Sequence, residues 1–126
     1  MSSQPQNQTG GAQPTTSDGY RLPSTKTLIN ASKLAISDDK PILLDYWTDS
    51  IDKTAIIGVK EGQKIVNPDG TETAGPQEKR LVKSEDQYTS FITKIFKIET
   101  DFIVVTENSI YLVDTGIPTK RISGMK

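Results

Sequence analysis

Residues 91–113, FITKIFKIETDFIVVTENSIYLV, contain three short runs of apolar and β-branched residues separated by brief polar connections. The runs cover residues 91–98, 102–106 and 109–113, and their composition is typical of β-strands. Connections of three and two residues can join only antiparallel neighbours. The stretch therefore predicts a three-stranded meander, with Asn108 in the left-handed conformation that such a short turn requires.

The first of these strands is partly apolar on both faces, because Phe96 and Ile98 lie on one face and Ile95 lies on the other. Such a strand is expected to be covered on both sides, by an N-terminal helix or by another subunit. The alternative is that barrel curvature hides one face, while the other face tolerates an isolated apolar side chain.

Upstream of the meander, further short strands are expected at residues 42–47, 54–60 and 80–83. The short polar connection TDSID predicts that the first two are neighbours in a hairpin. Residues 61–79 contain three Gly and two Pro and predict a protruding loop, for which a two-stranded stem is one alternative. Residues 84–90, after the strand at 80–83, are polar and expected to be irregular, with Tyr88 turned inward.

Five to six short strands with tight turns predict a mainly β fold, either a small antiparallel barrel or a curved sheet of SH3-like or OB-like type. Residues 25–36 are predicted to form one short helix, capped by Ser24 or Thr25. Its apolar face would hold Leu28, Ile29, Ser32, Ala35 and Ile36. The alternation of Leu34 and Ile36 leaves a strand as the other interpretation. Residues 25–126 are thus expected to form one small β-rich domain.

Residues 1–24 are dominated by Gln, Ser, Thr, Gly and Pro, and Asp18 and Arg21 are their only charged side chains. Such a segment buries too little apolar surface to offset the entropy of ordering, so a flexible, disordered polar arm is predicted. One interpretation is an idle tail, and the other is an arm that orders against a partner. In the second case Tyr20, Leu22 and Pro23 would be its contact points.

Composition excludes several classes of chemistry. The formal net charge of −1, from 15 basic and 16 acidic residues, argues against a general nucleic-acid binder. The chain has no Cys and no His, which excludes disulfides, thiol nucleophiles, imidazole chemistry and the usual zinc sites. No run approaches the ~20 apolar residues of a membrane span, and no signal peptide is recognisable. A location in the cytoplasm or within a virus particle is therefore expected.

No catalytic, cofactor-binding or metal-binding residue is predicted. Asp45, Asp49 and Asp52 lie close in the sequence to Tyr46 and Trp47. Two carboxylates beside aromatic residues could form a glycosidase-like site. The preferred interpretation is that Asp49 and Asp52 lie in a polar turn, where Asp is favoured. Tyr46 and Trp47 would point to opposite faces of a strand, so one of them is expected on the surface. Trp47 is either a core residue or an exposed interaction residue, with the core preferred.

The function expected from these features is that of a non-enzymatic assembly or adaptor module. It would dock on a larger protein partner or on itself, as an accessory structural component of a viral or phage particle does. One alternative is a small barrel that binds single-stranded nucleic acid through Tyr88, Phe96 and nearby lysines, and another is an inhibitor of one enzyme. The predicted partner-binding residues are Tyr20, Leu22, Trp47, Tyr88 and Phe96.

Overall fold

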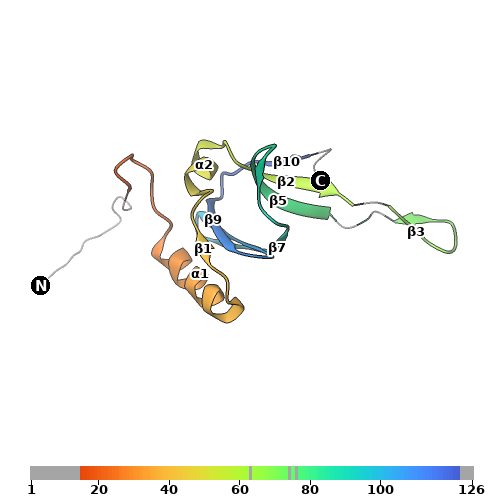
Figure 1. Cartoon of the computed structure of the whole chain (residues 1–126), viewed down its shortest axis with the longest axis horizontal. Helices are drawn as coiled ribbons and strands as arrows, with labels where there is room; N and C mark the ends of the chain where they lie inside the picture. The colour runs from red at the N-terminus through yellow and green to blue at the C-terminus, as the bar shows by residue number, and fades with distance from the viewer. Residues whose placement is uncertain (1–14, 63, 74, 76, 123–126) are drawn as a thin grey trace, which may run out of the picture.

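The computed structural model describes residues 15–62, 64–73, 75 and 77–122, and its helices and strands are shown in Figure 1. In chain order the elements are α1 (Thr25–Asp38), β1 (Ile42–Leu43), α2 (Trp47–Asp52), β2 (Ile56–Glu61), β3 (Ile65–Val66), β4 (Glu72–Thr73), β5 (Gln77–Ser84), β6 (Gln87–Tyr88), β7 (Ile92–Ile98), β8 (Asp101–Thr106), β9 (Ile110–Asp114) and β10 (Thr119–Arg121). The strands form two four-stranded sheets, in the orders β1-β9-β8-β7 and β10-β2-β5-β6, and a separate two-stranded ribbon of β3 and β4.

The central strands of the first sheet, β8 and β9, are buried on both faces, which explains their nearly continuous apolar sequence. Val104 faces the second sheet and belongs to the same cluster as Leu81 of β5. Ile103 and Leu112 face the other way and pack with Ala31 of α1. The domain therefore has three layers, with α1 on one face of the first sheet and the second sheet on its other face (Figure 1). Trp47 of α2 packs in the same cluster as Ala31 of α1.

The predicted meander is confirmed, because β7, β8 and β9 pair antiparallel in sequence order. The left-handed residue is Glu99, with φ of 55°, in the connection between β7 and β8. Asn108 is not among the residues of positive φ in the described part of the chain, so that detail was wrong. The turn between β8 and β9 closes differently, because the Thr106 hydroxyl accepts a hydrogen bond from the Ser109 N–H at 3.1 Å.

The predicted strand over residues 42–47 and its hairpin are wrong. Only β1 is a strand, and Ile42 pairs in parallel with Ile110 of β9. The next residues form helix α2, because Trp47, Ser50 and Ile51 recur at helical spacing and turn toward the interior. Consequently β2 is not a neighbour of β1 but lies in the other sheet, between β5 and β10.

The mainly β class is confirmed, whereas no closed barrel is found among the described residues. The two sheets keep separate hydrogen-bond ladders, and Tyr88 lies in the edge strand β6 with its side chain 40% exposed rather than turned inward. The C-terminal strand β10 pairs in parallel with β2, which the sequence did not indicate. An SH3-like or OB-like barrel is therefore not confirmed.

The predicted protruding loop is shorter than expected and has the two-stranded stem. Strand β2 continues to Glu61 and β5 begins at Gln77, while β3 and β4 pair antiparallel. The turn between β3 and β4 is closed by the Gly70 N–H, which donates to the Asn67 carbonyl at 2.9 Å, and Gly70 has φ of 89°. Figure 1 shows this ribbon extending away from the two sheets.

The helical interpretation of residues 25–36 is confirmed, but the helix packs on a different face from the predicted one. Thr27 and Ala31 are its buried residues, whereas Leu28, Ile29 and Ile36 are exposed. A small-residue face lets α1 lie close to the sheet, so the larger side chains point sideways or outward. Neither described helix is long and apolar enough to cross a bilayer.

The start of α1 is fixed by Ser24, whose hydroxyl accepts a hydrogen bond from the Thr27 N–H at 3.1 Å. We expect Ser24→Ala to lower the free energy of unfolding by about 1 kcal/mol, the usual cost of a lost N-cap. Urea denaturation followed by circular dichroism measures this difference. Ser37→Ala is the matched control, because Ser37 is exposed in the last turn of the same helix. An equal loss in both variants would contradict the capping role.

Candidate partner-binding site

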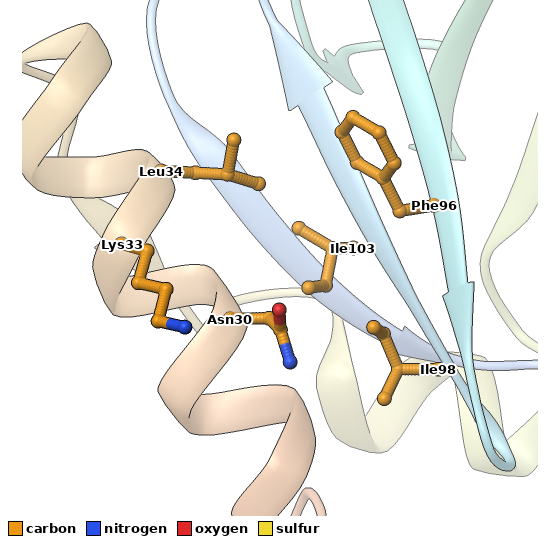
Figure 2. Close-up of a pocket in the computed structure, with 6 residues that line it drawn as sticks. All are labelled: Asn30, Lys33, Leu34, Phe96, Ile98 and Ile103. Atoms are coloured by element: carbon orange, nitrogen blue, oxygen red, sulfur yellow. The ribbon is translucent and has the colours of Figure 1, made fainter.

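An apolar groove of about 190 Å³ lies between α1 and the first sheet. Figure 2 shows Leu34 reaching from the helix toward Phe96 on β7, with Ile103 of β8 lying between these two elements. The same close-up places Ile98 further along the groove, beside Asn30. The groove forms because α1 packs against β8 and leaves Phe96 on the neighbouring strand β7 partly uncovered. A groove with this lining can bind apolar side chains.

The pairing register explains why Phe96 lines this groove. Opposite residues of an antiparallel pair share a face, and Phe96 is opposite Ile103, which packs on the helix side. Ile95 is opposite Val104 and packs between the sheets. Strand β7 therefore has apolar side chains on both faces, as predicted. The second sheet lies behind one face, and α1 lies beside the other. Phe96 nevertheless remains 39% exposed.

Strand β7 is also an edge of its sheet, paired only with β8. Over its seven residues, the backbone groups that point away from β8 belong to no sheet ladder of the described residues. Unpaired N–H and C=O groups of this kind are a template for another strand. A groove and an open strand edge thus lie side by side.

A second groove, of about 290 Å³, lies on the other side of β7, toward β5. Its lining is more polar and includes Gln77, Lys79, Thr93 and Lys94. Lys33 is the charged residue of the apolar groove, so every charged side chain lining either groove is a lysine. The surroundings of the β7 edge are therefore basic, although the whole chain has a net charge of −1.

The last residues of the predicted arm form a second feature, in which Arg21 is held against the domain. Its guanidinium Nη2 lies 2.7 Å from the buried Asp101 Oδ1 and also donates to Asp114 and, at 3.0 Å, to the Thr100 carbonyl. It lies 4.7 Å over the ring centroid of Trp47. Partial burial opposes the positive charge, but hydrogen bonds to the two carboxylates outweigh it and raise the pKa of Arg21.

We refer to Arg21 and its contacts with Asp101, Asp114 and Trp47 as the N-terminal clamp. Residues 1–14 of the predicted arm lie outside the described residues. Tyr20, Arg21 and Ser24 contact the domain, whereas residues 15–19 turn back so that Thr15 pairs with Arg21. Deleting residues 1–24, the whole predicted arm, would remove Arg21 and the Ser24 cap. Deleting residues 1–14 alone preserves both.

The five predicted partner-binding residues do not form one surface. The Tyr20 hydroxyl donates to Asp52 at 2.6 Å, and Leu22 is partly exposed beside the clamp. Trp47 is only 3% exposed, and its indole N–H donates to the Arg21 carbonyl at 2.8 Å. Its proposed role as an exposed contact is therefore wrong, because its ring is part of the core. Tyr46 is buried as well, and burial raises its pKa to about 12.

Tyr88 and Phe96 are separated by the architecture, since Tyr88 belongs to the second sheet and Phe96 to the helix side of the first. The Tyr88 ring already faces Arg80, whose guanidinium lies 4.9 Å from it and 4.2 Å from the Phe91 ring. The single aromatic surface expected for nucleic-acid binding is consequently not formed.

The acidic cluster near Trp47 is used in structural contacts. Asp49 accepts from the Thr54 hydroxyl at 3.0 Å and pairs with Lys83 at 3.2 Å, while Asp52 accepts from Tyr20. No group of three or more acidic residues that could hold a metal ion occurs in the described part of the chain.

Sequence reasoning missed the helix side of the groove, formed by Asn30, Lys33 and Leu34. Their spacing of three and four residues places them on one helical face, which was a usable signal. The sequence did not show that this face lies beside β7. Leu34 and Phe96, which line one groove, are 62 residues apart in the chain. Comparison with protein-family models, curated proteins and solved structures found no match for this chain.

Proposed function

We propose that this protein is a non-enzymatic assembly or adaptor module that binds a protein partner through the groove between α1 and β7. The observation that carries the proposal is the apolar groove beside an unpaired strand edge, with Phe96 partly exposed between them. A partially exposed aromatic side chain in a concave apolar site is typical of a residue that dominates a protein interface.

Two further features support an assembly role. The ribbon of β3 and β4 projects from the domain and exposes Ile65 and Val66, which offers a second contact point. The clamp holds the chain at Arg21 against the domain. A compact unit with several separate contact points suits an accessory structural component of a larger particle, such as that of a virus or phage. A particle-bound or cytoplasmic location accompanies this proposal.

The test compares Phe96→Ala with Tyr88→Ala by sedimentation of the full chain from its native source. These aromatic residues have nearly equal exposure, 39% and 40%, but only Phe96 lines the groove. We expect the unmodified chain and Tyr88→Ala to sediment with a large complex. Phe96→Ala should shift to the free fraction, because losing a central aromatic contact lowers affinity about tenfold or more.

Circular dichroism of the purified variants verifies that both are folded. A free, small species for the unmodified chain would contradict the assembly proposal. Retention of Phe96→Ala in the complex would contradict the groove as the binding site.

A further inference from the structure

We propose that the edge of β7 binds an extended acidic and apolar segment of a partner protein by strand addition. This inference rests on the proposed function and specifies the chemistry of the partner. Strand addition uses unpaired backbone groups for affinity and pockets for alternate side chains for specificity. The β7 edge has both, since grooves lie on its two sides.

The faces of β7 determine the pattern of the partner. Side chains on one face of an added strand would meet Phe96 and Ile98, which line the apolar groove with Leu34. Side chains on the other face would meet Lys97, which lies opposite Phe102 on the side of the second sheet, and the lysines of the second groove, while Ile95 of that face packs between the sheets. Because strand residues alternate between faces, the matching segment alternates apolar and acidic residues.

Charge argues for an acidic occupant. Four lysines surround the edge: Lys33 on α1, Lys79 on β5, and Lys94 and Lys97 on β7. Within the part of the chain that the structure describes, none of the four forms an ion pair. Carboxylates on a partner would meet several positive charges that have no acidic neighbour within ion-pair distance among these residues.

The same charges disfavour a second copy of this chain. Pairing two β7 edges would bring two copies of Lys94 and Lys97 into one seam, and lysines on an edge strand discourage edge-to-edge association. The N-terminal residues 1–14 are an unsuitable occupant as well, because they contain no Asp or Glu.

The probe is a labelled nine-residue peptide of alternating valine and glutamate, titrated against the full chain and followed by fluorescence anisotropy. We expect saturable binding, and Lys97→Glu should weaken it at least about tenfold. Lys120→Glu is the matched control, since it makes the same charge change on exposed β10, in the other sheet. It should leave binding unchanged. A peptide of alternating valine and lysine should bind Lys97→Glu better than it binds the unmodified chain.

Backbone pairing is tested with the same peptide N-methylated at alternate residues, which removes N–H donors and keeps the side chains. The inference requires that methylation on one edge of the peptide abolish binding. Full binding of both methylated peptides, one blocked on each edge, would overturn strand addition. Equal losses in Lys97→Glu and Lys120→Glu would also overturn it, because that result indicates unspecific charge attraction.

Two other outcomes separate this inference from the proposed function. Tighter binding of a single-stranded oligonucleotide than of the peptide, with sensitivity to Lys97→Glu and none to Phe96→Ala, would replace the acidic segment by nucleic acid. If the peptide fails to bind while Phe96→Ala still releases the chain from its complex, strand addition by an acidic segment is contradicted. The assembly role is then still supported.

Discussion

Replacing Trp47 with alanine is expected to lower the free energy of unfolding by about 3–5 kcal/mol, the range for a large aromatic residue removed from a core. The side chain is almost wholly buried and packs with Ile103, Leu112 and Ala31. It also supports the Arg21 guanidinium and donates to the Arg21 carbonyl. Its removal would therefore open a cavity and release one side of the N-terminal clamp.

Trp47→Phe separates these two contributions, because phenylalanine fills most of the volume and lacks the indole N–H. We expect it to cost less than half as much as alanine, with about 1 kcal/mol from the lost hydrogen bond. Urea denaturation followed by circular dichroism measures both variants, since Trp47 is the only Trp and its fluorescence is lost. If Trp47→Ala lowered the free energy of unfolding by less than Tyr88→Ala, which removes an exposed aromatic side chain, the core position of Trp47 would be contradicted.

Replacing Asp101 with alanine is expected to lower the free energy of unfolding by about 3–5 kcal/mol, as when one partner of a buried ion pair is removed. Asp101 is fully buried, and its Oδ2 accepts from the Ser24 N–H at 2.9 Å and the Thr27 hydroxyl at 2.7 Å. Its Oδ1 faces Arg21. One carboxylate thus connects the clamp, the start of α1 and the turn into β8.

Asp114→Ala is the control for this prediction, because Asp114 also pairs with Arg21 but is partly exposed. Water can replace part of its interactions, so we expect a cost of about 1 kcal/mol or less. Both variants retain Trp47, and its fluorescence reports their unfolding in urea. Equal costs for the two aspartates would show that burial of Asp101 contributes nothing beyond a surface ion pair.

The losses of unfolding free energy in Trp47→Ala and Asp101→Ala should not be independent, since Trp47 and Asp101 both contact Arg21. Neighbouring residues with a shared partner show coupling in a double-mutant cycle. The double variant is therefore expected to lose less stability than the sum of the single variants.

Several elements of the fold were predictable because their causes are local. The meander of residues 92–114 follows from three apolar runs and two short connections, and such connections leave only antiparallel neighbours. The turn at Asn67–Gly70 follows from residue types that favour turns. Phe96 was identified as a candidate contact because apolar residues occur on both faces of its strand.

Other elements were missed because their causes are distant in the sequence. The run ILLDYW has strand-forming residues, but its second half becomes part of a helical turn because Trp47 is buried against the first sheet. Strands β1 and β10 contain two and three residues, and each exists because a longer strand, β9 or β2, offers it an edge. Local propensity is weak in such short segments, so tertiary context overrides it.

The mainly β class, the meander and the absence of Cys and His chemistry follow from the sequence alone, whereas the choice of Ser24 over Thr25 as the helix cap does not. The contact between Arg21 and Asp101, 80 residues apart, and the groove bordered by α1 and β7 appear only in the folded chain. Turn length, caps and periodicity act between near neighbours in the chain, and they are therefore visible in the sequence. Burial, ion pairing and grooves depend instead on which distant segments pack together.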